Sequence, residues 1–352
     1  MAQALRLAEQ GLYSTSPNPR VGCVVARDGK VVSEGWHQRA GTPHAEVHAL
    51  QQAGAQARGA TVYVTLEPCS HHGRTPPCAD ALIAAGVTRV VAAMHDPNPQ
   101  VAGRGLARLQ AAGIAAECGL MEETARELNI GFVSRMTRGR PWVRLKAAAS
   151  LDGKTALDNG ISKWITGAAA RHDVQRWRAR SCAMLTGIGT VLADDPQMNV
   201  HEIETSRQPL RVVVDSQLRT PPGAKMLADG GVLIVSAIEE RAKIQALRDA
   251  GAEVAVLTAN HGRVDLARLM SLLAQREVNE LMVEAGATLN GALLAAGLVD
   301  ELVLYLAPLL MGDAARGLFA FPALNHMDEC KKLALRDVRQ VGGDMRVMAR
   351  VS

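Results

Sequence analysis

The sequence lacks long apolar runs, concentrated basic blocks and aromatic residues, and each absence narrows the classes of protein that it can encode. Only 3% of the 352 residues are aromatic and the 39 Lys and Arg are scattered, whereas nucleic-acid-binding surfaces are typically basic stripes with interleaved aromatic residues. No apolar run approaches the ~20 residues that span a bilayer, and no signal-peptide pattern is present. We therefore expect a cytoplasmic protein without membrane or nucleic-acid partners, whose net charge of +4 reflects local anion sites.

Cysteine is also sparse, and its six irregular positions do not have the density of a disulfide-stapled secreted domain. This distribution predicts a reducing compartment in which thiols act singly or as metal ligands. The length, with 48% hydrophobic and 21% charged residues, allows two domains with separate cores. The cysteines are Cys23, Cys69, Cys78, Cys118, Cys182 and Cys330.

The first 139 residues show an α/β pattern. "VGCVVARDGKVVSEGW" predicts two strands joined by a turn at Asp28 and Gly29. Short strands and helices of ~10 residues then alternate, which predicts a largely parallel sheet covered by helices on both faces. The expected helices are 43–53, 77–85, 103–113 and one from 121, and the expected strands are 61–66, 87–94 and a short one at 114.

A short basic stretch, "TRGRP", separates this part from a second α/β pattern, so we predict two domains, 1–139 and 140–352. The second pattern has too many strands and helices to be an appendage of the first domain. Its strand candidates are 142–150, 182–187, 210–216, 231–236, 252–258, 279–286, 301–308 and 346–351.

A metal site is predicted in the first domain. His44 and Cys78 each stand at an expected helix start, and Cys69 stands where a strand ends. The positive ends of two helix dipoles would favour thiolates there. One imidazole and two thiolates supply three ligands for Zn²⁺ and leave the fourth position for water, as in catalytic zinc sites. Glu46 would then carry protons to and from that water, whose pKa zinc lowers toward ~7.

The alternative to this zinc site is an ordinary helix start with a solvated carboxylate at Glu46, beside inert buried cysteines. The order His-x-Glu, Pro-Cys, Cys favours the zinc deaminase arrangement. Eight residues separate the two cysteines instead of two, and the polar, basic insert suits a phosphorylated substrate. Other histidines are weaker candidates: His37 is unassigned, packing is favoured for His48, and substrate contact is an open question for His71 and His72.

The second domain has no G-x-G-x-x-G after its first strand, so the usual dinucleotide fingerprint is absent. "NELMVEAGATLNGALL" and "TGIGTVLADDP" each place glycine between a strand and a helix. Such a turn either binds phosphate through backbone N–H groups or carries glycine for steric reasons alone, and Asp194 and Asp195 in the second turn also suit a solvated loop or helix cap. Asp215 would suit NAD, whereas Ser216 and Arg219 would suit NADP.

The N-terminal half resembles the cytidine/deoxycytidylate deaminase superfamily. The chain as a whole resembles the bacterial bifunctional deaminase/reductases of riboflavin biosynthesis. The resembling motifs occur in the same order and cover nearly its full length. The resemblance implies a cytidine-deaminase-like three-layer αβα domain followed by a dihydrofolate-reductase-like α/β domain. The motifs that carry it are "SPNPRVGCVV", "HAEVHAL", "VTLEPCSHHGRTPPC", "DPNPQVAGRG", "KAAASLDGKTA", "WITG", "TVLADDPQMNV", "VDSQLR" and "VEAGATLNGALL".

The activity that this resemblance implies has two steps. The first is zinc-dependent hydrolytic deamination of 2,5-diamino-6-ribosylamino-4(3H)-pyrimidinone 5′-phosphate. The second is reduction of the ribosyl group of the product to ribityl by NADPH. The implied partners are phosphorylated pyrimidines and further copies of the chain, in a homodimer or a higher homo-oligomer, because relatives often dimerise through the reductase half.

The resemblance also assigns site residues. Asn18 would line the pyrimidine pocket near Glu46, and Lys146 would lie beside the reacting ribose carbon. One departure is His201, which stands where relatives typically have arginine, while Asn199 replaces the usual threonine. The implied sugar-phosphate contacts are Ser162, Arg178, Met198, His201 and Glu284. The implied cofactor contacts are Ala148, Trp164, Thr190, Asp194, Ser216, Gly286, Ala287, Thr288, Leu289, Asn290, Gly291 and Ala292.

Two other functions remain to be weighed. One is a tRNA- or nucleotide-editing zinc deaminase with an appended binding domain, which the long loop between the cysteines and the scattered basic residues disfavour. The other is a non-enzymatic module in which a fourth protein ligand closes the zinc site. The intact set of open-site residues disfavours it.

Overall fold

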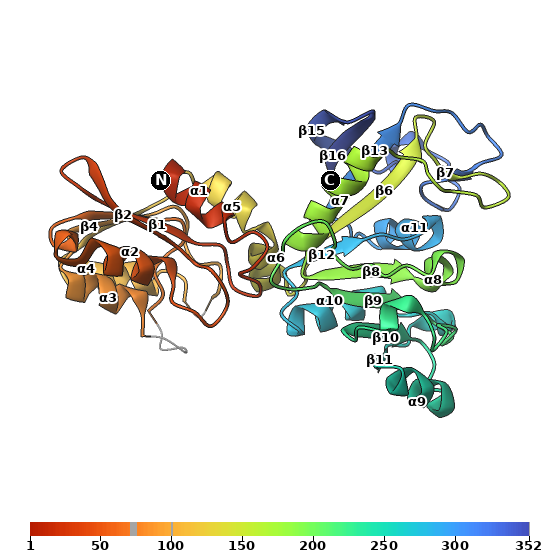
Figure 1. Cartoon of the computed structure of the whole chain (residues 1–352), viewed down its shortest axis with the longest axis horizontal. Coiled ribbons are helices and arrows are strands. Elements are labelled where there is room, and N and C mark those ends of the chain that lie inside the picture. Colours follow the sequence, from red (N-terminus) through yellow and green to blue (C-terminus); the bar gives the residue numbers. More distant parts are fainter. Residues whose placement is uncertain (71–75, 100, 352) are drawn as a thin grey trace. The chain divides into compact units, whose positions relative to one another are not determined.

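The computed structural model describes residues 1–70, 76–99 and 101–351, and the chain forms two compact units, Met1–Arg140 and Pro141–Ser352 (Figure 1). Each unit has its own sheet and its own hydrophobic core. His71 and His72, considered above as substrate contacts, lie outside the described residues.

The first unit is built on a five-stranded sheet in the order β2-β1-β3-β4-β5. A hairpin joins β1 to β2, and its turn residues Asp28 and Gly29 have φ of 50° and 72°, the left-handed pair that tight hairpins require. The predicted pair of strands joined by a turn is confirmed. The sheet is mixed instead of largely parallel, because β1 also pairs antiparallel with β3, and only β3, β4 and β5 pair in parallel. The strands are β1 Gly22–Arg27, β2 Lys30–Trp36, β3 Thr61–Val64, β4 Arg89–Ala92 and β5 Ala115–Cys118.

Helices cover both faces of this sheet, which confirms the predicted three-layer αβα architecture. Side chains of α2, α3 and α4 pack on one face, and those of α1, α5 and α6 pack on the other. The last predicted helix is interrupted at Asn129, which separates α5 from α6. The helices are α1 Ala2–Glu9, α2 Ala45–Ala53, α3 Cys78–Ala85, α4 Arg104–Ala111, α5 Glu122–Leu128 and α6 Ile130–Arg138.

The second unit is built on a nine-stranded sheet in the order β11-β10-β9-β8-β12-β6-β13-β16-β15. The seven strands from β11 to β13 are parallel, and the C-terminal pair is antiparallel. All eight predicted strands are present; β7, β14 and the exposed edge strand β15 were not predicted. The strands are β6 Trp142–Ser150, β7 Lys154–Ala156, β8 Ala183–Gly187, β9 Leu210–Val214, β10 Val232–Ser236, β11 Ala252–Val256, β12 Glu280–Val283, β13 Glu301–Ala307, β14 Arg316–Gly317, β15 Leu333–Val341 and β16 Asp344–Val351.

The chain leaves the adjacent strands β6 and β12 in opposite directions. The connection through α7 leads from β6 to β8, whereas the connection through α11 leads from β12 to β13. In open α/β sheets, ligands bind beyond the carboxyl ends of strands at such a switch point. The helices are α7 Ala168–Arg180, α8 Ile188–Asp194, α9 Arg241–Asp249, α10 Leu266–Gln275 and α11 Ala287–Ala295, with short 3-10 helices at Gly54–Ala57, Lys225–Leu227, Asn260–Gly262 and Met327–Glu329.

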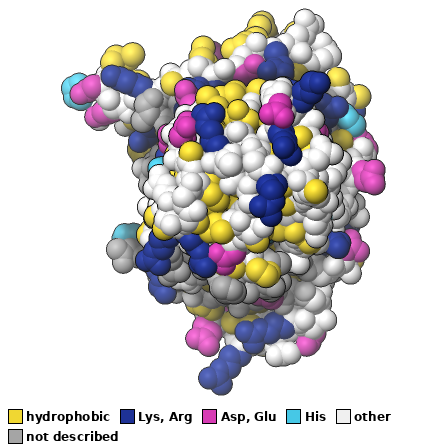
Figure 2. All heavy atoms as spheres, turned by 90° about the vertical axis from the view of Figure 1, so that its left-hand side faces the viewer, with side chains coloured by type: hydrophobic (Ala, Val, Ile, Leu, Met, Phe, Trp, Pro, Cys, Tyr) yellow, Lys and Arg dark blue, Asp and Glu magenta, His cyan; other side chains and the backbone are white. Residues whose placement is uncertain are grey.

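Two features of the structure concern the nucleic-acid and membrane partners that the sequence disfavours. On the face drawn in Figure 2, Lys and Arg side chains are dispersed among acidic, apolar and uncharged atoms and form no continuous stripe. Among the described residues, no helix is long and apolar enough to cross a membrane.

Close packing between α2 and β2 fixes the start of α2. Gly35 lies on β2, and a Cβ added to it would be 2.3 Å from the carbonyl oxygen of Ala45 and 2.6 Å from the amide nitrogen of Ala49. Because both obstacles are backbone atoms, no side-chain rotation can relieve the clash. The absence of a side chain at this position lets the helix lie directly on the strand.

The substitution Gly35→Ala should therefore destabilise the first unit by about 1–3 kcal/mol, the usual cost of overpacking a close contact. Thermal unfolding followed by circular dichroism measures the effect. Gly223→Ala is the matched control, because a Cβ there would meet nothing within 4 Å. Equal melting temperatures for the two variants would contradict this account of the packing.

Candidate active sites

The first candidate site gathers three residues at the ends of three elements. His44 is the N-cap of α2, Cys69 follows β3, and Cys78 is the first residue of α3. The imidazole Nδ1 of His44 lies 3.2 Å from the sulfur of Cys78 and 3.7 Å from the sulfur of Cys69. The three donor atoms all lie within 4.8 Å of one another.

These distances fit a tetrahedral metal. Zinc bonds of about 2.3 Å to sulfur and about 2.0 Å to nitrogen place neighbouring ligand atoms about 3.6 Å apart. Within the described ranges, this is the group of His, Cys, Asp and Glu side chains close enough to hold an ion, and it has three members. Three protein donors leave one tetrahedral position for a water or a substrate atom.

The two thiols differ in their tendency to ionise. The hydrogen bond from Cys78, with a further contribution from His44, lowers the pKa of Cys69 to about 4. The same hydrogen bond and burial raise the pKa of Cys78. Cys69 therefore carries the first negative charge of the site, and the hydrogen bond that the His44 ring donates to this sulfur raises the pKa of His44.

Glu46 lies in the first turn of α2, and its side chain is almost completely buried, with a residue exposure of 3%. Burial, and then the negative charge of Cys69, raise the pKa of its carboxyl to about 7. A carboxyl that titrates near neutrality can both accept and release a proton during one reaction cycle.

Asn18 is connected to this cluster through His37, a residue to which the sequence analysis assigned no role. His37 Nδ1 lies 3.2 Å from the carbonyl oxygen of Pro43, and its Nε2 lies 3.1 Å from Nδ2 of Asn18. A proton on Nδ1 satisfies both contacts, so Nε2 accepts from the Asn18 amide. The His37 ring also packs edge-on against His44, with centroids 5.4 Å apart. No local pattern around His37 pointed to this role.

The second candidate site lies at the switch point of the large sheet. Lys146 is on β6, Glu284 follows β12, and Arg178 is on α7. Arg178 donates to both carboxylate oxygens of Glu284, at 2.8 and 2.9 Å, and Lys146 Nζ lies 3.9 Å from Glu284. Residues predicted from different motifs thus meet in one largely buried cluster.

The electrostatics of this cluster differ from those of Glu46. Burial alone would raise the pKa of Glu284, but Arg178 and Lys146 outweigh burial and hold this pKa at about 2. Burial lowers the pKa of Lys146, whereas Glu284 acts in the opposite direction. Glu284 is therefore an anion at neutral pH.

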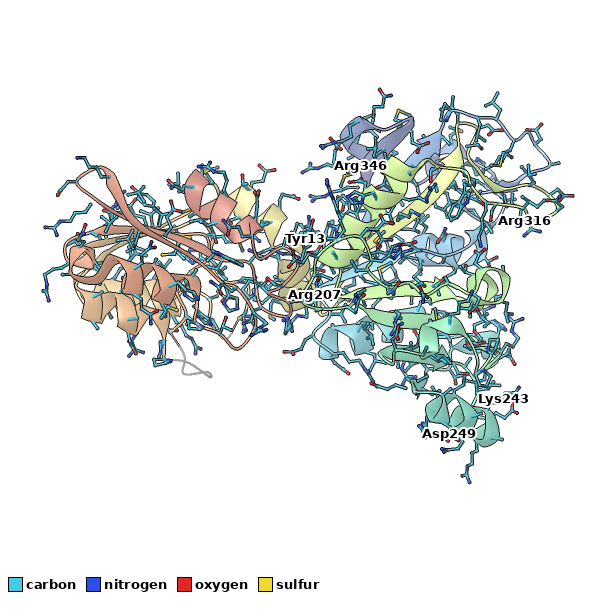
Figure 3. The ribbon with its side chains drawn as sticks, in the orientation of Figure 1. Tyr13, Arg207, Lys243, Asp249, Arg316 and Arg346 are labelled. Atoms are coloured by element: carbon cyan, nitrogen blue, oxygen red, sulfur yellow. The ribbon has the colours of Figure 1, made fainter. Side chains whose placement is uncertain are left out.

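Helix α7, which carries Arg178, is attached to the sheet by charged and aromatic contacts. Arg346, labelled in Figure 3, donates to Asp173 at 2.7 Å, and the Tyr305 hydroxyl donates to the same carboxylate oxygen at 2.7 Å. The guanidinium of Arg144 lies 4.9 Å from the centre of the Trp177 ring. These contacts fix the rotation of α7 about its axis.

The segment 198–201 lies against α7. The carbonyl of Asn199 accepts from Arg178 at 3.1 Å, and the backbone N–H of His201 donates to Gln175 at 3.1 Å. Met198 is buried and has φ of 53°. The structure thus brings Met198 and His201 to the helix that carries Arg178. Ala148 lies two residues beyond Lys146 on β6, and therefore on the same face of that strand.

The predicted cofactor residues form two groups. Lys163 pairs with Asp194 at 3.4 Å, which brings the loop with Ser162 and Trp164 to the end of α8, the helix that contains Thr190. Trp164 is 73% exposed, and the guanidinium of Arg171 lies 4.6 Å from the centre of its ring.

The second group comprises the turn before α11 and Ser216. Gly286 is the N-cap of α11, so its first turn, with Ala287, Thr288 and Leu289, directs backbone N–H groups outward. Asn290 is buried and donates to the carbonyl of Ala285, Gly291 is in contact with the backbone of Ala320, and Ala292 follows them in the helix. Ser216 Oγ accepts from the backbone of Val264 at 3.3 Å. The contacts found among the described residues do not join Ser216 to this turn.

The fold and the sites define a class of protein in which a unit of the zinc deaminase type precedes an α/β unit with a charged cluster at the switch point of its sheet. Residues 1–94 match the family model for the cytidine and deoxycytidylate deaminase zinc-binding region, and residues 141–347 match the RibD C-terminal domain. The chain belongs to the RibD family of bifunctional riboflavin biosynthesis proteins.

Individual relatives match over nearly the whole chain. The riboflavin biosynthesis protein RibD of Escherichia coli is 51% identical over 98% of this chain and 96% of its own length, and that of Haemophilus influenzae is 48% identical over 99% and 95%. The solved structure of Acinetobacter baumannii RibD, form 2, superposes with a TM-score of 0.92 at 46% identity, covering 100% of this chain and 97% of its own. A Thermotoga maritima structure, described as a diaminohydroxyphosphoribosylaminopyrimidine deaminase/5-amino-6-(5-phosphoribosylamino)uracil reductase, has a TM-score of 0.88 at 32% identity with the same coverage.

Removing the Arg178 guanidinium should raise the pKa of the Glu284 carboxyl, which this guanidinium lowers in the wild-type chain. In Arg178→Met, burial is opposed only by Lys146, so the pKa of Glu284 should rise from about 2 to above its ordinary value of 4.5. In the wild-type chain, the low folded-state pKa stabilises the fold above pH 4.5, and this contribution is lost as pH falls toward 2.

Carbon-13 NMR titration of labelled glutamate carboxyls measures the shift, with Glu284→Gln for assignment. Arg171→Met is the control, because Arg171 lies on the same helix but contacts Trp164. A Glu284 pKa that stays near 2 in Arg178→Met would contradict the assigned cause.

Proposed function

We propose that the first unit hydrolyses the amino group at C2 of 2,5-diamino-6-ribosylamino-4(3H)-pyrimidinone 5′-phosphate, and that the second unit reduces the ribosyl group of the product. The observation that carries the first assignment is the convergence of His44, Cys69 and Cys78 beside a buried Glu46. The Thermotoga maritima relative, described as a deaminase/reductase acting on compounds of this kind, supports both assignments.

In the deaminase unit, His44, Cys69 and Cys78 would hold Zn²⁺, which supplies a bound water acidic enough to ionise near neutrality. Glu46 accepts a proton from the attacking water and gives it to the departing amine. The water oxygen bonds to C2, the C–N bond breaks and ammonia leaves. The second water proton moves to a ring nitrogen, so that a carbonyl remains at C2. Asn18 contacts the pyrimidine, and its amide nitrogen is oriented by His37.

In the reductase unit, bound NADPH would supply the hydride that C1′ of the ribosyl group needs. The bond from C1′ to the ring oxygen breaks, and that oxygen gains a proton. Lys146 lies beside the reacting carbon, and burial lowers its pKa, so its ammonium can release a proton to the ring oxygen. Glu284 holds the ammonium in place, and Arg178 keeps Glu284 ionised. Ser162, Met198 and His201 complete the sugar-phosphate contacts.

The cofactor is bound by Ala148, the Trp164 loop, α8 with Thr190 and Asp194, and the backbone of 286–292. The environment of Asp215 supports NADP over NAD. Asp215 is fully buried and accepts at 2.7 Å from both the backbone N–H and the hydroxyl of Thr220, so it is not presented to a ribose hydroxyl. Ser216 and the exposed Arg219 remain beside that strand end for an additional phosphate.

We also propose that the protein is cytoplasmic and forms a homodimer. None of the six cysteines, which all lie in the described part of the chain, forms a disulfide, in keeping with a reducing compartment. Strand β15 forms one edge of the large sheet, and Leu333, Leu335 and Val338 on it are 45%, 68% and 52% exposed. Exposed apolar side chains on an edge strand favour association with another chain, which we propose is a second copy.

Leu335→Arg should weaken that association and yield monomer in sedimentation velocity at concentrations where the wild-type chain is dimeric. Val31→Arg is the control, because Val31 is 50% exposed on β2, an edge strand of the other sheet. A dimer that persists in Leu335→Arg would place the interface elsewhere.

The two units should be separable by mutation. Glu46→Gln removes the proton carrier and should lower ammonia release by about 10²- to 10⁴-fold, the usual contribution of general acid–base catalysis. Zinc content and NADPH oxidation on the deaminated intermediate should be unchanged. Lys146→Met should give the reverse pattern.

The readouts are ammonia release, metal analysis and absorbance at the NADPH band. Loss of both activities in a folded Glu46→Gln chain would contradict the assignment of two independent sites. A zinc-loaded wild-type chain that releases no ammonia from the substrate would contradict the first reaction.

A further inference from the structure

The carboxylate of Glu67 is buried two residues before Cys69, and its side chain has 0% exposure. Neither the zinc site nor the proposed mechanism uses it. Both oxygens accept hydrogen bonds, mostly from backbone N–H groups of one later segment. Oε2 accepts from Asp96 and Gly103 at 3.2 and 3.0 Å and lies 3.2 Å from His95 Nδ1, and Oε1 accepts from Gly105 and Leu106 at 2.9 and 3.3 Å.

These donors surround the start of α4. The first N–H groups of a helix have no partner within the helix, and a carboxylate there also interacts favourably with the helix dipole. Glu67 thus caps α4 from a distant part of the chain. The contact is close: a Cβ on Gly105 would lie 1.9 Å from the carbonyl oxygen of Pro68, the residue between Glu67 and Cys69.

Cys69 is held from its other side by α3. The backbone N–H of Cys78 donates to the Cys69 sulfur at 3.2 Å, and that of Ala79 donates to the Cys69 carbonyl at 3.1 Å. Arg108 on α4 pairs with Asp80 on α3 at 2.6 Å, which joins the two helices next to both cysteines.

We propose that Glu67 is a positioning residue for the metal centre. By attaching the peptide that precedes Cys69 to the start of α4, it fixes the Cys69 sulfur at bonding distance from an ion that Cys78 and His44 also reach. The proposal rests on the zinc site proposed above. It differs from the role of Glu46, because Glu67 is bonded to backbone and moves no proton.

A simple helix cap would stabilise the fold and leave metal affinity unchanged, so affinity and stability must be measured separately. Glu67→Gln keeps the side-chain volume but replaces one acceptor oxygen with an NH₂ group that faces two backbone N–H donors. We expect zinc affinity to fall about 10- to 100-fold, as for other groups that orient metal ligands. Competition with a chromophoric chelator measures it on the full chain.

Glu117→Gln is the matched control, because the Glu117 carboxylate lies on the surface and pairs with Arg89 at 3.0 Å. NADPH oxidation by the second unit reports that the rest of the chain is intact and should not change in either variant. Glu67→Asp, which keeps the charge but shortens the reach, should lose less zinc affinity than Glu67→Gln and gives a second measurement if the latter folds poorly.

Each outcome decides the question. If the metal-free Glu67→Gln chain melts at a lower temperature but binds zinc with wild-type affinity, Glu67 is only a helix cap and the proposal is wrong. Wild-type zinc affinity in Glu67→Asp would also overturn it. Weaker zinc binding in both variants, with wild-type binding in Glu117→Gln, supports it. A wild-type chain that binds no zinc would instead overturn the proposed metal site itself.

Discussion

The deaminase unit depends on one arrangement: two helices begin where one strand ends. His44 caps α2, Cys78 opens α3, and Cys69 follows β3, so the three donors meet only if both helices lie close to the sheet. Gly35 permits that approach for α2, and Gly105 lets the start of α4 lie against the carbonyl group of Pro68, directly before Cys69. Missing side chains at two positions therefore determine the geometry of a site to which neither residue contributes a ligand.

Two buried glutamates of this chain have pKa values shifted in opposite directions, and this difference separates their roles. Glu46 is buried beside an anionic sulfur, so its pKa rises to about 7 and it can exchange protons. Glu284 is buried beside Arg178 and Lys146, so its pKa falls to about 2 and it remains a fixed anion. Both residues are glutamates with largely buried side chains, and the neighbouring charges decide between proton transfer and orientation.

Much of this structure could be predicted from the sequence, because strand periodicity and helix-terminal residues are local signals. Eight of the eleven strands of the second unit and the convergence of His44, Cys69 and Cys78 follow from such signals. Strand β15 was missed because it is exposed on both faces and carries charges where a buried strand would alternate. The contacts of His37 and Glu67 were missed because their partners are distant in sequence and no local pattern encodes them.

The charged network under α7 explains how the reductase cluster is held together. Arg144 donates to Glu280 at 2.7 Å, Arg180 donates to the same oxygen at 2.7 Å, and all three are largely buried. Buried ion pairs are a weak source of stability, since apolar replacements of similar volume are often as stable. Their directional contacts do, however, determine the rotation of the helix, which an apolar face would leave free to shift. That rotation places Arg178 on Glu284 with two parallel hydrogen bonds, and so the network acts through position more than through stability.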